Sequence, residues 1–218
     1  MGCIRAFWRS LVGKKVIMAV TGVILLLYIV GHLLGNLQIF EGPERLNAYA
    51  RFLKSTGELL WAVRIVLLLS LVLHIIASVQ VSLASKRARP ADYEKKESIE
   101  TSYAARTMIW SGPLIFLYVV YHLAMFTFLV TGPGYSPTDV YRNEVQAFQV
   151  PAISLFYVVA IVFLGMHLYH GAWSMLHTLG VSNPRYRFLR KTIAPVVAIA
   201  ITAGYIAIPI AVLMGFIS

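Results

Sequence analysis

The sequence predicts an all-α integral membrane protein, built as a single domain over residues 1–218, with five transmembrane helices. Hydrophobic residues make up 59% of the chain and charged residues only 13%, and the mean hydropathy is +0.74. The apolar residues gather into segments about as long as the 20 residues that a helix needs to cross a bilayer. These segments lie near Val16–Phe40, Leu59–Ser85, Thr107–Thr131, Pro151–Leu179 and Ile193–Ile217.

The first segment is predicted to be a retained helix and not a cleaved signal peptide. Its start is basic, but its apolar run continues for about 25 residues and lacks a cleavage site of small residues. The second and fourth segments exceed a minimal span, so we expect them to tilt or to project beyond the bilayer. The fifth contains Pro195, Gly204 and Pro209, which membrane helices tolerate. It has no histidine, and we expect it to pack against the outside of the bundle.

The basic residues predict the orientation of the chain. Four of them lie in the loops after the first and third segments, and 14 lie in the N-terminal tail and in the loops after the second and fourth segments. The larger set is Arg5, Arg9, Lys14, Lys15, Lys86, Arg87, Arg89, Lys95, Lys96, Arg106, Arg185, Arg187, Arg190 and Lys191. The positive-inside rule therefore places the N-terminus in the cytoplasm and the C-terminus outside. Because the basic residues lie mostly on one side, we attribute the net charge of +10 to the membrane topology and not to nucleic-acid binding. The loop around Lys86–Lys96 is either a solvated loop or a docking surface for a cytoplasmic partner.

Four histidines stand inside the apolar segments, one in each of the first four: His32, His74, His122 and His167. An ionisable side chain in hydrocarbon is costly, so each is a candidate functional residue. The only cysteine, Cys3, provides neither a disulfide nor a site for covalent haem. Ala6 breaks the myristoylation pattern after the initial Met-Gly, and we expect the Cys3 thiol to be unmodified.

The predicted topology converts the position of each histidine into a depth. His32 and His122 precede the outer ends of their helices by about two turns, which puts them roughly 12–14 Å below the outer surface. His74 and His167 follow the outer starts of their helices by about four turns, which puts them roughly 22–24 Å down. The histidines therefore form two levels about 10 Å apart, and each level draws one residue from each of two helices.

Two histidines from different helices at one level can bind the two axial positions of a haem iron, which favours electron transfer over oxygen binding. Zinc fits less well because it needs its ligands to converge at one point. A single intramembrane histidine often only hydrogen-bonds across helices. Four in two matched levels favour two b haems, one held by His32 and His122 and the other by His74 and His167.

A weak internal repeat supports this pairing, because Tyr28–Leu33 recurs as Tyr118–Leu123 and the histidine spacing is similar in both halves. Tyr28 and Tyr118 lie one turn before their histidines, where they either contact the imidazole or act as core aromatics. His170 is the alternative to His167 as a ligand. His177 is expected near the membrane interface.

These features together resemble the di-haem cytochrome b membrane-anchor subunit of succinate:quinone oxidoreductases, the single-polypeptide b558-like type that also anchors fumarate reductases. The resemblance rests on the five spans, on the order of the histidines, and on the stretches His32–Gln38 and His167–Ser174. It implies that His32 and His122 hold the haem distal from the catalytic subunits and that His74 and His167 hold the proximal haem.

The resemblance also implies partners and a location. These are a flavoprotein subunit that carries the dicarboxylate chemistry, an iron–sulfur subunit on the cytoplasmic side, and the bacterial cytoplasmic membrane. Electrons would pass to a quinone, which the resemblance implies is menaquinone. Glu58 is the nearest carboxylate for a quinone site, with Asn36, Gln38 and Arg64 as further candidates. Whether succinate oxidation or fumarate reduction is the physiological direction stays open.

Two other functions remain open from the residues alone. One is a cytochrome b subunit of a hydrogenase or a formate dehydrogenase. The other is a haem-free, proton-coupled transporter that uses buried histidines as a relay. A cytochrome of the bc type fits less well, because it places two histidines on each of two helices.

Overall fold

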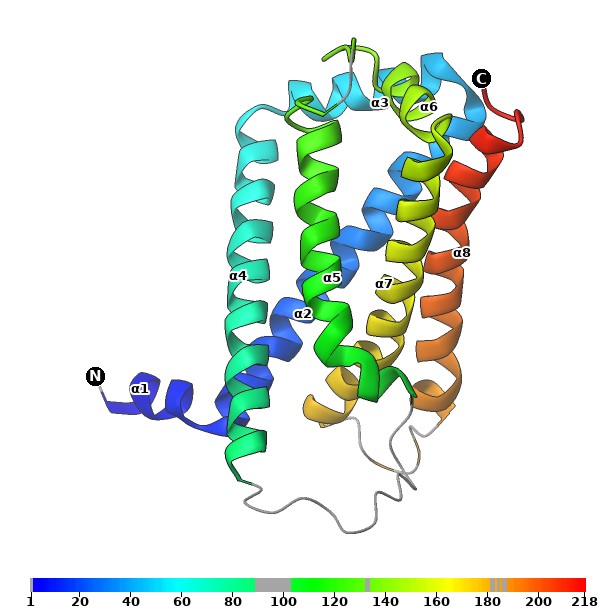
Figure 1. The fold of residues 1–218 in the computed structure, drawn as a ribbon. Coiled ribbons are helices and arrows are strands. Elements are labelled where there is room, and N and C mark those ends of the chain that lie inside the picture. The colour runs from blue at the N-terminus through cyan, green and yellow to red at the C-terminus, as the bar shows by residue number, and fades with distance from the viewer. Residues whose placement is uncertain (1, 89–102, 132–133, 181–182, 184, 186–187) are drawn as a thin grey trace.

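The computed structural model describes residues 2–88, 103–131, 134–180, 183, 185 and 188–218, and its ordered elements in those ranges are helices (Figure 1). Five helices are long and apolar enough to cross a membrane, over Leu11–Glu41, Glu58–Arg87, Thr107–Phe126, Pro151–Thr178 and Lys191–Leu213. This confirms the prediction of an all-helical, multi-pass membrane protein.

The spans are α2 (Leu11–Asn36), which continues into the 3₁₀ helix η1 (Leu37–Glu41), then α4 (Glu58–Arg87), α5 (Tyr103–Phe126), α7 (Pro151–Thr178) and α8 (Ala194–Leu213). The π-helical turn η3 (Leu189–Ile193) leads into α8. Two predicted ends were wrong, because α5 stops before Thr131 and α8 stops before Ile217. After α8, Gly215 has a φ of 76° and Phe216 N–H donates back to the Ala211 carbonyl. This pattern is typical of a glycine-terminated helix end.

Three shorter helices were not predicted: α1 (Gly2–Arg9), α3 (Pro43–Ser55) and α6 (Val140–Phe148). In Figure 1, α3 and α6 lie across the top of the bundle beside the C-terminus. We call this the capped end. The N-terminus and α1 lie at the opposite end. Apolar length was the only signal used to find helices, and these three are too short and too polar to give it.

Side-chain hydrogen bonds of one asparagine join α3 to α6. Asn47 Nδ2 donates to Asp139 Oδ1 at 2.9 Å, and the Tyr141 N–H donates to Asn47 Oδ1 at 3.1 Å. Asp139 also caps α6 by accepting from the Arg142 N–H at 3.1 Å. The hydrogen bond from Asn47 is the main cause that holds the pKa of the Asp139 carboxyl below its usual value. The cap is therefore an ordered layer and not a loose connection.

Among the spans, α2 packs along α4, α5 packs on α7, and α7 packs on α8. Close approach of α7 and α8 requires glycine at one point, because a Cβ on Gly165 would lie 2.2 Å from Thr202 Oγ1. The packing role expected for the fifth span is thus observed. The buried hydrophobic cluster, which includes Ile39, Met125 and Tyr157, lies towards the capped end.

Candidate functional site

The four intramembrane histidines stand on four different helices, α2, α4, α5 and α7, and their rings meet in two pairs. The ring centroids of His32 and His122 are 5.8 Å apart, and those of His74 and His167 are 6.4 Å apart. His32 and His122 each lie four residues before the end of their helix at the capped end. The other pair lies deeper in the bundle. These are the pairs that the depth argument expects.

The spacing of both pairs fits one metal ion between two imidazoles. An imidazole nitrogen lies about 2 Å from a first-row metal ion, so two rings on opposite sides of one ion have centroids about 6 Å apart. Over the described part of the chain, no three His, Cys, Asp or Glu side chains converge on a common point. The geometry therefore suits two-ligand centres, with the remaining metal positions filled by a macrocycle.

Hydrogen bonds determine which nitrogen of His74 can bind a metal. His74 Nδ1 lies 3.1 Å from the Met18 carbonyl oxygen and 3.2 Å from Thr21 Oγ1. A carbonyl only accepts, and the Thr21 hydroxyl already donates to Ile17 O at 2.7 Å. His74 Nδ1 therefore carries the proton, and Nε2 keeps its lone pair. This is the arrangement that metal-binding histidines commonly have.

The same logic holds for His167 and His122. His167 Nδ1 lies 3.3 Å from Ser111 Oγ, and Ser111 Oγ can donate to the Met108 carbonyl at 3.3 Å. His122 Nδ1 lies 3.4 Å from the Tyr157 hydroxyl, which can donate to a methionine sulfur at 3.8 Å. In both cases the hydroxyl is free to accept from Nδ1–H, which leaves Nε2 available.

Thr21, Ser111 and Tyr157 were not identified from the sequence. Each is a hydroxyl side chain in an apolar segment, and Thr21 and Ser111 are 5% and 1% exposed. A buried polar atom inside a membrane helix was the signal that could have found them, because such an atom needs a partner. The partner helix, however, is not readable from local sequence.

Aromatic rings surround the His32–His122 pair. Tyr28 stacks on His32 with centroids 5.3 Å apart, and Tyr118 lies 5.9 Å from His122. Both tyrosines therefore contact the histidines. The fifth span also reaches the pair, because the Tyr205 ring lies 6.3 Å from His32 and its hydroxyl donates to the Ile29 carbonyl at 2.8 Å. The sequence had indicated only a packing role for that span.

His170 and His177 lie on α7 beyond His167, and both contact Trp173. The ring centroids of His170 and Trp173 are 6.2 Å apart, and those of His177 and Trp173 are 5.8 Å apart. It is the His167 ring that faces His74. The geometry therefore favours His167 over His170 as the partner of His74.

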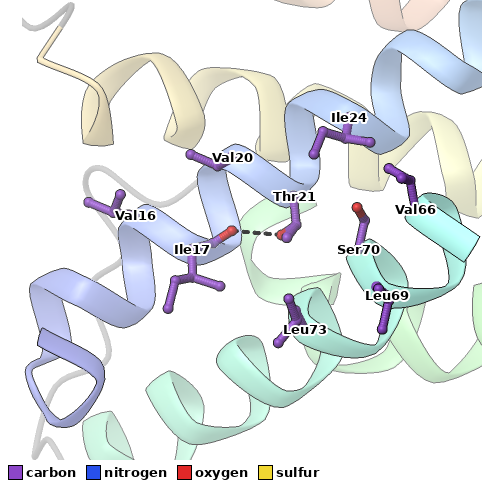
Figure 2. Close-up of a pocket in the computed structure, with 9 residues that line it drawn as sticks. All are labelled: Val16, Ile17, Val20, Thr21, Ile24, Val66, Leu69, Ser70 and Leu73. Carbon is purple, nitrogen blue, oxygen red and sulfur yellow. Dashed lines mark hydrogen bonds between the residues drawn. The ribbon is translucent and has the colours of Figure 1, made fainter. Parts of the chain in front are cut away.

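A groove of about 380 Å³ lies between α2 and α4 (Figure 2). Its wall is aliphatic except for two hydroxyls, and is formed by Val16, Ile17, Val20, Thr21, Ile24, Val66, Leu69, Ser70 and Leu73. Thr21 belongs both to this wall and to the hydrogen bonds of His74. Nearby, a Cβ on Gly22 would lie 3.5 Å from His74 Cε1, an ordinary van der Waals distance, so α2 passes close to this side of the ring.

The residues suggested for a quinone site lie towards the capped end. Glu58 and Arg64 are exposed on the first turns of α4, where the Arg64 guanidinium lies 5.1 Å from the Trp61 ring centroid. Asn36 and Gln38 are half-buried where α2 passes into η1. Within the described ranges, no hydrogen bond or ion pair joins any two of the four. The structure therefore places the four at the same end of the bundle without direct bonds between them.

The basic positions gather at the end opposite the cap. Lys86 and Arg87 are exposed on the last turn of α4, and Arg5 and Arg9 are exposed on α1. The later basic positions of the Lys86–Lys96 loop, Arg89, Lys95 and Lys96, lie outside the described residues, as does Arg187.

No protein-family model matches the sequence, and no curated protein or solved structure is significantly similar to the chain.

Proposed function

We propose that this chain is the di-haem cytochrome b anchor subunit of a membrane succinate:quinone oxidoreductase. One observation carries the proposal. Two pairs of histidine rings, each pair from two helices, stand at the separation that bis-imidazole ligation requires. In three of the four rings Nδ1 can donate its hydrogen bond to a neighbouring oxygen, which leaves Nε2 available.

In this proposal His32 and His122 hold one b haem, and His74 and His167 hold the other. Bound haem supplies one-electron redox chemistry between ferric and ferrous iron. The chain itself orients the ligands: Thr21 and Met18 fix the His74 ring, Ser111 fixes His167, and Tyr157 fixes His122. Held by two imidazoles in this way, each haem would supply electron transfer and not oxygen binding.

The distribution of charge supports an orientation and a docking side. The end of the bundle with α1 and the last turn of α4 is basic, so the positive-inside rule puts it in the cytoplasm and the capped end outside. We infer that the basic end docks an iron–sulfur subunit, which in turn contacts a flavoprotein that handles succinate. This assignment of partners, and of the bacterial cytoplasmic membrane, rests on the resemblance of His32–Gln38 and His167–Ser174 to the family.

The electron acceptor is a quinone, with menaquinone as the expected species. We propose that it reacts near the His32–His122 pair, because that pair lies towards the capped end and Glu58, Asn36, Gln38 and Arg64 lie at the same end. Carboxylate and amide side chains there would supply hydrogen bonds and exchange protons with a quinone head group.

The decisive experiment is a reduced-minus-oxidised spectrum with haem quantitation on the complex purified from membranes, repeated with succinate as the only reductant. Two b haems per chain, reduced by succinate through the partner subunits, would support the proposal. Haem that succinate does not reduce would favour the hydrogenase or formate dehydrogenase type of cytochrome b. A folded protein without haem, purified from haem-supplied cells, would contradict the proposal and favour the transporter.

A further inference from the structure

The first helix, α1 (Gly2–Arg9), lies across the direction of the membrane spans. In Figure 1 it projects sideways from the start of α2, away from the rest of the bundle, at the end opposite the cap. It packs on α2 and on no other helix to a comparable extent. About one and a half turns of α2 separate α1 from Val16, where the apolar run begins. Since α2 crosses the membrane, α1 comes at the level of the lipid headgroups.

Hydrogen bonds of Ser10 fix the corner between α1 and α2. The Ser10 hydroxyl donates to the Phe7 carbonyl at 2.8 Å, at the end of α1, and accepts from the Gly13 N–H at 2.9 Å, at the start of α2. The Ser10 N–H also donates to the carbonyls of Ala6 and Phe7, each at 3.1 Å. A Cβ on Gly13 would overlap the Phe7 carbonyl oxygen, so this corner requires glycine. The direction of α1 is therefore set by the chain itself and not by packing on another element.

Helix α1 carries basic and aromatic side chains on different sides. Arg5 and Arg9 are four residues apart, so they share one face, and both are exposed. Phe7 is two residues from each arginine, so it falls on the opposite side, with Trp8 on the flank. The Phe7 side chain is 47% exposed. Aromatic rings at the headgroup level, opposite a basic face, are typical of a helix that lies in the membrane interface.

The positive charge of α1 continues into α2. Lys14 and Lys15 lie on the first turns of α2, which makes four basic residues between Arg5 and Lys15. Residues 1–40 contain no aspartate or glutamate, so no acidic neighbour along the chain balances these charges. The positive-inside rule puts this end in the cytoplasm. Basic clusters beside the cytoplasmic end of a span attract the anionic lipids of that leaflet.

We propose that α1 is a membrane-surface helix that binds the anionic headgroups of the leaflet from which α2 enters the bilayer. Arg5 and Arg9 contact the phosphates, and Phe7 enters the boundary between headgroups and acyl chains. Because the corner at Ser10 already sets the direction of α1, little order has to be gained on binding. The contact holds the start of α2 at the membrane surface. The inference requires only that α2 spans a membrane, and it does not depend on haem.

The test uses the full-length chain in vesicles of phosphatidylcholine alone or of phosphatidylcholine mixed with phosphatidylglycerol. Cys3, the only cysteine and a residue of α1, takes a spin label without any substitution. Access of the label to oxygen, which dissolves in the bilayer, and to a water-soluble nickel chelate reports the depth of α1. The variant R5Q/R9Q removes both charges of the basic face. The matched control R51Q/R142Q removes two exposed charges at the capped end.

We expect phosphatidylglycerol to lower access of the nickel chelate in the wild type and in R51Q/R142Q, but not in R5Q/R9Q. Each arginine should contribute about fivefold to the ratio of docked to free α1, and added salt should lower that ratio. G13A should free α1 from the surface with both arginines intact, because its Cβ displaces the Phe7 carbonyl from the corner.

An equal response of the wild type to both kinds of vesicle would overturn the inference, as would equal behaviour of R5Q/R9Q and R51Q/R142Q. Protection of the label that appears only in the complete complex, whatever the lipid, would overturn it in favour of a protein partner on α1. Haem content, measured on the same samples, tests the proposed function separately.

Discussion

Around the His32–His122 pair the neighbouring side chains are aromatic, whereas around the His74–His167 pair they are short and carry hydroxyls. Tyr28, Tyr118 and Tyr205 contact the first pair, and Thr21 and Ser111 hydrogen-bond the second. The first pair also lies beneath a cap with a buried carboxyl, and the second lies beside an aliphatic groove. Burial and hydrogen bonding tune the potential of a haem. Two centres with the same ligands are therefore expected to have different potentials.

The largest expected effect comes from replacing single histidines, because each replacement should affect one pair and not the other. Replacing His74 or His167 by alanine should remove one haem and leave the other, and replacing His32 or His122 should remove the complementary one. Each variant is expected to retain about half of the haem per chain, because one imidazole would hold a proposed haem less tightly than two.

Pyridine haemochrome quantitation and redox titration of the remaining haem measure this effect. H170A is the matched control on the same helix and should keep both haems. If H170A loses a haem and H167A keeps both, His170 and not His167 would be the residue that pairs with His74.

The second prediction concerns only the capped end. It tests the ionisation of Glu144 through the pH dependence of the free energy of unfolding. The folded-state pKa of Glu144 is raised from 4.5 to about 8, so the folded protein holds a proton that the unfolded chain has lost between these values. The free energy of unfolding should therefore fall as pH rises from 4.5 to about 8 and be level on either side. E144Q should remove this fall, which is on the order of a few kcal/mol.

Unfolding of detergent-solubilised protein across that pH range, followed by circular dichroism, checks this prediction. E44Q should keep the wild-type dependence, since its side chain is exposed. If the free energy of unfolding of E144Q falls with pH as much as that of the wild type, another group is responsible.

A third prediction compares the hydrogen bonds of the two pairs. S111A should weaken retention of the haem that we propose for His74 and His167, and Y157F should weaken retention of the haem that we propose for His32 and His122. The expected loss of affinity is about 10–100-fold in each case, because the partner of Nδ1 fixes the orientation and tautomer of the ligand.

Haem dissociation to an apo-globin acceptor measures this loss for each centre. S78A on α4 serves as the control, because among the described residues the Ser78 hydroxyl donates only to the Ile75 carbonyl of its own helix. If S111A affects the His32–His122 haem instead, the assignment of partners is wrong.

The smallest effect concerns the cap itself. N47A removes two hydrogen bonds between α3 and α6 and should destabilise the cap by about 1–3 kcal/mol. Since the cap covers only the first pair, the potential of the capped-end haem should respond, and that of the deeper haem should not. Hydrogen exchange of the α6 amides, compared with that of an S55A control, reports on this change.

The five spans and the two levels of histidines were predictable from the sequence because a membrane imposes a length on each helix. Once the length is known, position along the chain becomes depth, and His32 must meet His122 and not His167. The same reasoning cannot find α3 or α6, because a short amphipathic helix has no such constraint. The same reasoning predicts α5 and α8 to be longer than they are, because their apolar residues continue past the backbone turns that end the helices.

Which side chains hydrogen-bond the histidines was decided by the tertiary structure. Ser111 and Thr21 are recognisable in the sequence as hydroxyls in apolar helices, but which histidine each one bonds depends on how the helices are rotated about their axes. Glu144 looks like an ordinary polar residue in a loop between two spans. Only the packing of α6 over the bundle buries it, because burial is a property of neighbouring elements and not of the local sequence.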